Sequence, residues 1–164
     1  MSSQDHNSQP SLPRFWNITH PKNLFFTGRE EVLTQLRTTL ENGHMPVSTR
    51  PLAICGLGGI GKTQIVLEYV YSSLSLYHAI LWVRADSRAE IISSYIAIAA
   101  LLDLPQQNEK DETQVIAAVM NWLQTQKKWL LIFDNGDDPN IVTEGNASNC
   151  SSDVGDLLTT PNQL

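Results

Sequence analysis

A glycine-rich segment at residues 56–63, Gly-Leu-Gly-Gly-Ile-Gly-Lys-Thr, sets tight limits on how this chain can fold. It follows the apolar run 51–55 and precedes a stretch with helical character, which is the setting of a phosphate-binding loop. The glycines let the backbone approach phosphate oxygens, the lysine supplies positive charge, and the threonine hydroxyl suits Mg²⁺. The residues that this pattern predicts to contact a phosphate ligand are Gly56, Leu57, Gly58, Gly59, Ile60, Gly61, Lys62 and Thr63.

Apolar patterns around this segment alternate between strand and helix. Short apolar runs predict strands, and apolar residues that recur every three to four positions predict helices. This alternation is typical of a parallel sheet covered by helices on both faces, so the predicted fold class is α/β. Ligands in such folds bind at the carboxyl ends of the strands. The expected strands are 51–55, 79–83 and 129–133, and the expected helices are 29–42, 62–75, 88–102 and 112–123.

An aspartate, Asp134, ends the third apolar run. A carboxylate at a strand end can hold Mg²⁺ beside bound phosphates, so Asp134 and Thr63 are the expected metal ligands. The next residue is Asn135, the candidate catalytic residue, whose amide can orient water but cannot accept its proton. Asp137 and Asp138 lie nearby, either as proton acceptors or as solvated turn residues.

Length, charge and composition exclude several classes of protein. A chain of 164 residues can bury one core, and a net charge of −6 with scattered basic residues argues against binding nucleic acid. The two cysteines, Cys55 and Cys150, have neither a disulfide nor a metal spacing. We find neither a signal peptide nor an apolar span of about 20 residues, so we expect a cytoplasmic protein without membrane partners. Residues 1–23 are rich in Ser, Gln, Asn and Pro and are expected to form a flexible, disordered leader.

Several stretches together resemble the NB-ARC nucleotide-binding domain of the signal-transduction (STAND) P-loop NTPases. Phe-Phe-Thr-Gly-Arg-Glu at 25–30 resembles the family's lead-in motif, and the segment 130–138 resembles its metal-binding strand end. The loop at 56–63 is similar to its phosphate loop, and Leu-Trp-Val-Arg-Ala-Asp at 81–86 to the second strand of its bacterial and fungal members. The resemblance covers about residues 24–140.

This resemblance implies a three-layer P-loop NTPase sandwich with a parallel sheet. It also implies that ATP or ADP is the ligand, together with Mg²⁺, and that the nucleotide acts as a switch with slow hydrolysis. The lead-in motif would lie against the adenine and ribose. On this basis Thr27, Gly28 and Arg29 become candidate nucleotide contacts.

The C-terminal part departs from the family pattern. Residues 156–160 resemble its fourth strand, which lies between the phosphate-loop strand and the strand that ends at Asp134. Pro161 stands where the family carries an arginine that senses the γ phosphate, and proline cannot make that contact. The family's lid subdomains and sensor repeats cannot fit in the 30 residues after Asp134. The resemblance therefore implies a domain at 24–164 that is truncated after about its fourth strand, with the lid and repeats supplied by missing C-terminal segments or a partner protein.

Three functions remain open on the sequence. The first is an ADP- or ATP-binding module of a signalling switch, with slow or absent hydrolysis and at most a slow Mg²⁺-dependent ATPase activity. The second is an independent P-loop phosphotransferase, which would need a second substrate pocket and an arginine-rich lid. The third is an interaction module that keeps the fold without turnover. Nucleotide binding without hydrolysis would separate the third from the first, and phosphate transfer to an acceptor would identify the second.

Overall fold

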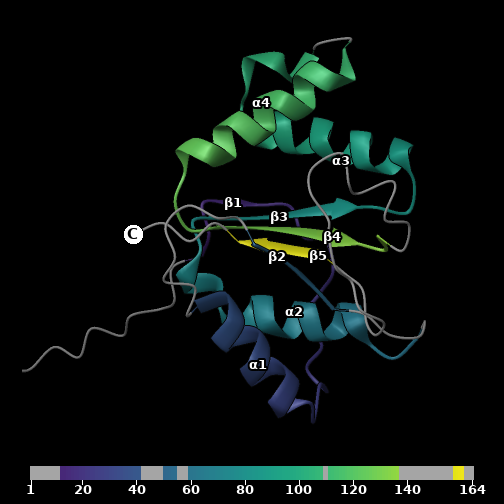
Figure 1. Cartoon of the computed structure of the whole chain (residues 1–164), viewed down its shortest axis with the longest axis vertical. Coiled ribbons are helices and arrows are strands. Elements are labelled where there is room, and N and C mark those ends of the chain that lie inside the picture. The colour runs from purple at the N-terminus through teal and green to yellow at the C-terminus, as the bar shows by residue number, and fades with distance from the viewer. Residues whose placement is uncertain (1–11, 42–49, 55–58, 109–110, 137–156, 161–164) are drawn as a thin grey trace, which may run out of the picture.

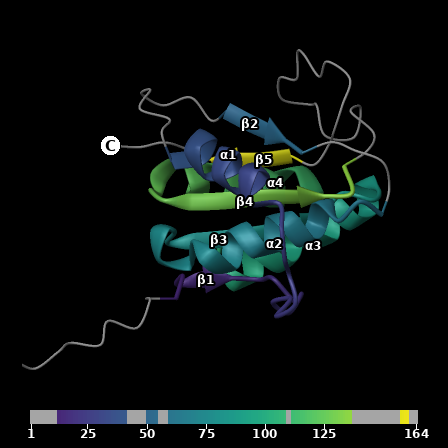
Figure 2. The same ribbon diagram turned by 90° about the horizontal axis from the view of Figure 1, so that it is seen from below.

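The computed structural model describes residues 12–41, 50–54, 59–108, 111–136 and 157–160, and five strands of these ranges form one sheet. The strands are β1 (Phe15–Trp16), β2 (Arg50–Ala53), β3 (Ala79–Arg84), β4 (Trp129–Asp134) and β5 (Leu157–Thr160). Their spatial order is β1-β3-β4-β5-β2, which can be followed in Figure 2. β1, β3 and β4 are parallel, whereas β5 is antiparallel to both β4 and β2.

Helices cover both faces of this sheet and give three layers (Figure 1). The predicted helices and strands are all present, with ends that differ from the prediction by a few residues. None of the helices in the described ranges is both long and apolar enough to cross a membrane. One layer holds α1 (Glu30–Glu41) and α2 (Lys62–Ser72), the other holds α3 (Arg88–Leu101) and α4 (Glu112–Thr125), and the short 3-10 helices are η1 (Leu74–Leu76) and η2 (Pro105–Asn108).

Local sequence explains where α3 and α4 begin. Ser87 Oγ accepts a 3.3 Å hydrogen bond from Glu90 N, and Asp111 Oδ1 accepts one of 3.0 Å from Thr113 N. Both caps satisfy backbone donors that have no partner within the helix. The backbone bond from Thr113, followed by the side-chain bond from Gln114, holds the pKa of Asp111 below its ordinary value.

The two helical layers enclose two separate cores because side chains alternate along the central strands. In β3, Ile80 and Trp82 belong to the core beneath α1 and α2, whereas Leu81 and Val83 belong to the core beneath α3 and α4. A strand buried on both faces reads as a continuous apolar run, which explains why β3 and β4 were recognisable from sequence.

The α/β class is confirmed, but the prediction of a wholly parallel sheet is wrong at β5. β5 occupies the position predicted for the fourth strand, with Leu158 opposite Ile132 of β4 and Leu52 of β2. Its direction is reversed. Backbone donors and acceptors can pair in either direction, so a short apolar run does not encode the direction of its strand. β2, the strand before the glycine-rich loop, lies at the edge of the sheet that the described residues form.

The flexible leader predicted at residues 1–23 is wrong for its second half. β1 pairs with the start of β3, and Ile18 is only 7% exposed. Beyond β1, Asn17 Nδ2 donates to Trp82 O at 2.9 Å, and Asn17 Oδ1 accepts from Trp82 N at 2.6 Å. Asn17 is one of the polar residues that led to the prediction of disorder, yet its side chain satisfies two backbone groups of β3. The ordered domain begins before residue 24, and residues 1–11 lie outside the described ranges.

Candidate functional site

The glycine-rich loop leads into the N-terminus of α2. Gly59 and Gly61 have φ angles of 82° and 89°, in the left-handed region that favours glycine. Gly61 is the N-cap of α2, which begins at Lys62. The backbone N–H groups and the dipole at a helix N-terminus favour an anion at this position. The other predicted glycine-loop residues, Gly56, Leu57 and Gly58, lie outside the described ranges.

Thr63 and Asp134 meet at the carboxyl end of the sheet, although 71 positions separate them. Thr63 Oγ1 donates a hydrogen bond of 3.0 Å to Asp134 Oδ1. Asp134 ends β4 and is 8% exposed, and its backbone carbonyl accepts a 2.7 Å bond from Ala85 N, just after β3. The ends of two neighbouring strands therefore hold this carboxylate against the first turn of α2, and metal binding by Thr63 and Asp134 stays a prediction.

The Thr63–Asp134 pair fits a hard divalent cation. Both side chains present oxygen atoms, which are the ligands that Mg²⁺ prefers. A buried carboxylate loses hydration, and a cation beside it compensates for that loss. Within the described ranges, no group of three or more His, Cys, Asp or Glu residues could hold a metal ion. Phosphate and water oxygens would therefore have to complete the coordination of Mg²⁺ at this pair.

The predicted lead-in motif reaches the loop through Arg29. Its Nη2 donates a hydrogen bond of 3.2 Å to the carbonyl oxygen of Ile60. Gly28 and Arg29 have φ angles of 78° and 64°, so the chain turns sharply before α1. Thr27, Gly28 and Arg29 are all exposed. The structure thus brings two predicted nucleotide-binding segments together, while contact with the base or ribose stays a prediction.

An open pocket of about 490 Å³ lies between the chain before this motif and α2. Residues 20–25 line it on one side, and Gln64 and Leu67 of α2 line it on the other. Leu24 and Phe25 are 83% and 88% exposed. No local sequence signal predicts this pocket, because it depends on how the lead-in segment packs against α2.

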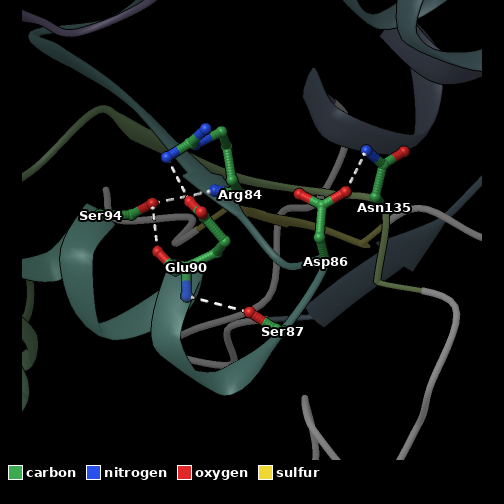
Figure 3. Close-up of polar contacts among 6 residues, drawn as sticks. All are labelled: Arg84, Asp86, Ser87, Glu90, Ser94 and Asn135. Atoms are coloured by element: carbon green, nitrogen blue, oxygen red, sulfur yellow. Dashed lines mark hydrogen bonds and ion pairs between the residues drawn. The ribbon is translucent and has the colours of Figure 1, made fainter.

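Asn135, the candidate catalytic residue, points towards Asp86 at the end of the neighbouring strand (Figure 3). Its Nδ2 donates a hydrogen bond of 2.9 Å to Asp86 Oδ1. Asn135 has a φ of 61°, a conformation that asparagine adopts more readily than most residues with a side chain. Asp86 was not predicted as a site residue. The available signal was that it closely follows one apolar strand, much as Asp134 ends another. The two other acids, Asp137 and Asp138, lie outside the described ranges.

Comparison with known proteins shows a partial similarity to a much longer protein. It is similar to a nucleotide-binding leucine-rich repeat (NLR)-like protein of Hyaloscypha variabilis (strain UAMH 11265 / GT02V1 / F), with 29% identity over 145 residues and 83% of this chain covered. The chain spans 15% of the length of that relative. No protein-family model and no solved structure matches the chain. The similarity fits a coarse relationship to NLR-type proteins.

Proposed function

We propose that this chain is the ADP- or ATP-binding module of a nucleotide-dependent signalling switch of the NB-ARC type. The observation that carries the proposal is the 3.0 Å contact between Thr63 Oγ1 and Asp134 Oδ1. It joins the end of a phosphate-binding loop to a strand-end carboxylate, and these are the two halves of a magnesium–nucleotide site in P-loop proteins. The similarity to an NLR-like protein supports a signalling role.

The phosphate end of the nucleotide would be held at the start of α2. Backbone N–H groups of the loop bind phosphate oxygens there, and Lys62 places its charge beside the terminal phosphates. Thr63 and Asp134 would hold Mg²⁺, which neutralises phosphate charge when it is bound. All three residues lie where α2 meets the end of β4.

The base and ribose would lie against the lead-in segment. Arg29 holds this segment to the loop through the Ile60 carbonyl, which leaves exposed Thr27 and Gly28 close to the phosphate loop. The pocket between residues 20–25 and α2 lies next to the same segment and offers additional apolar surface.

Hydrolysis is slow or absent in this proposal. Asn135 follows the metal-binding Asp134, and its amide cannot accept the proton of an attacking water. A general base typically raises the rate of a reaction by about 10²–10⁴-fold. Asparagine at position 135 cannot supply this increase in the rate of hydrolysis. The Asn135–Asp86 contact also favours the interaction module without turnover, the third function considered from the sequence. Segments outside this chain, or a partner protein, would supply the lid of the switch.

Calorimetric titration of ADP and ATP, each with Mg²⁺, tests the binding function directly. The chain should bind both nucleotides, and Lys62→Ala should weaken both by at least about tenfold because charge-assisted contacts to phosphate are lost. Lys127→Ala is a matched control, since this exposed lysine precedes β4 at the opposite end of the strand. Equal binding by the wild type and Lys62→Ala would refute the assigned role. Phosphate release above the Lys62→Ala background would separate the switch from the interaction module, and transfer to an acceptor would identify a phosphotransferase.

A further inference from the structure

Asp86 and Asn135 form a hydrogen-bonded pair at the edge of the candidate site. Asn135 directly follows Asp134, whose carboxylate contacts Thr63 at 3.0 Å. Its amide nitrogen lies 2.9 Å from Asp86 Oδ1. β3 and β4 are parallel, and Arg84 lies opposite Asp134 in their last register pair. The Asp86–Asn135 pair therefore spans the two strand ends one to two residues beyond the proposed metal-binding carboxylate.

The backbone around Asp86 is held at several points, as Figure 3 shows. Before Asp86, Arg84 N donates a 3.1 Å hydrogen bond to Ser94 Oγ, which in turn donates one of 2.8 Å to Glu90 O. After Asp86, Ser87 Oγ caps α3, and the side chains of Arg84 and Glu90 form an ion pair. Because β3 and α3 are tied together on both sides of Asp86, the backbone from which this exposed carboxylate extends is held in place.

Hydrogen-bond chemistry sets the orientation of the Asn135 amide. An ionised carboxylate only accepts hydrogen bonds, so Asp86 selects the amide nitrogen of Asn135 rather than its oxygen. The γ phosphate of ATP is a second anionic acceptor, and it would arrive beside the neighbouring Asp134. It would compete with Asp86 for the orientation of the Asn135 amide, because both N–H groups are on the same nitrogen and turn together. ADP carries no γ phosphate and leaves the Asp86–Asn135 bond intact.

We propose that Asp86 determines the preference of the site for ADP over ATP by holding the Asn135 amide away from the γ phosphate. This inference rests on the proposed nucleotide-binding function and adds its selectivity. Loss of Asp86 releases the amide donor, which then stabilises bound ATP but not bound ADP. Asp86 acts through Asn135, so its effect requires the asparagine side chain.

Titrations of ATP and ADP with Mg²⁺ at high ionic strength test this selectivity, because salt screens the long-range effect of a removed charge. Asp86→Ala should lower the ratio of the Kd for ATP to the Kd for ADP by about threefold to tenfold, as expected for one net hydrogen bond. Asp86→Leu, whose side chain has the same branching and the same number of non-hydrogen atoms as aspartate, repeats the measurement. Glu112→Ala, which removes an exposed charge on α4, should leave the ratio unchanged.

The same titrations on Asn135→Gly show whether the effect passes through the amide. Glycine suits the positive φ of this position, so the variant removes the side chain without strain. The double variant of Asp86 and Asn135 should have the same ratio of the Kd for ATP to the Kd for ADP as Asn135→Gly alone. The reason is that substitutions of two residues that act as a pair do not have additive effects. Thermal unfolding without nucleotide checks that each variant keeps its fold.

Several outcomes would overturn the inference. The first is an unchanged ratio of the Kd for ATP to the Kd for ADP in both Asp86 variants, and the second is an equal loss of affinity for both nucleotides. The third is a change in this Kd ratio that persists when the Asn135 side chain is absent. The proposed function is judged separately by Lys62→Ala. If wild type binds both nucleotides, Lys62→Ala does not, and the Asp86 variants keep the wild-type ratio, only the selectivity inference fails. A wild-type chain that binds neither nucleotide overturns both.

Discussion

Replacing Asp134 with asparagine should stabilise the nucleotide-free chain while it removes Mg²⁺-dependent nucleotide binding. Asp134 is 8% exposed as a residue, and its Oδ1 accepts a 3.0 Å hydrogen bond from the neutral Thr63 hydroxyl. A neutral donor offsets only part of the hydration that a buried charge loses. Asparagine has nearly the same shape, carries no charge, and keeps an oxygen that can accept from Thr63.

The expected gain in unfolding free energy for Asp134→Asn is about 1–2 kcal/mol. It is far below the full cost of burying a charge, because Asp134 is the last residue of β4 and retains some contact with water. The new amide nitrogen also needs a partner, which reduces the gain. For a chain of this size the gain corresponds to a rise in Tm of about 2–8 °C.

Urea unfolding followed by tryptophan fluorescence measures this change, because Trp82 and Trp129 are 5% and 4% exposed within the sheet. ADP with Mg²⁺ at about 100 times its Kd should add about 2.7 kcal/mol to the wild type, and much less to Asp134→Asn. Thr63→Val is the matched control, because it removes the hydroxyl and leaves the carboxylate buried, so it should destabilise the chain. An Asp134→Asn variant that is less stable than wild type, yet equally stabilised by nucleotide, would show that Asp134 has a structural role instead.

Two further predictions concern the edge of the sheet and the α3–α4 layer. Asn17→Ala leaves the backbone N–H and C=O of Trp82 without their side-chain partner. The free energy of unfolding, measured by urea titration, should therefore fall by about 2–4 kcal/mol. An Asn17→Ala variant as stable as the wild type would show that this contact does not stabilise the fold. Burial raises the pKa of Tyr95 from 10.0 to about 12, so the folded state binds the phenolic proton more tightly than the unfolded chain. The contribution of Tyr95 to the free energy of unfolding is fully present below about pH 10. It should fall by up to about 3 kcal/mol as the pH rises towards 12. Tyr95→Phe should lack this component, and identical stability profiles of the two proteins above pH 10 would contradict it.

Local patterns were sufficient to predict the elements that carry the site. The glycines of the loop are placed where a left-handed backbone is needed, as the φ angles of Gly59 and Gly61 show. Apolar periodicity located the four helices and the strands β2, β3 and β4, because burial on one or both faces leaves a repeat in the sequence itself. The proximity of Thr63 and Asp134 was also predictable, since parallel strands end at a common edge.

Contacts between distant residues decided the rest. β5 runs antiparallel, and Asn17 completes the edge of β3 from 65 positions away, although its own segment reads as disordered. Asn135 donates a hydrogen bond to Asp86, which is 49 positions earlier in the sequence. The position next to Asp134 therefore carries a polar pair, although asparagine itself cannot accept a proton. Periodicity records which side of an element is buried, but it does not record which strand direction or which polar partner the folded chain will supply. Those choices arise only when the backbone brings separate segments together and their hydrogen-bonding groups must be satisfied.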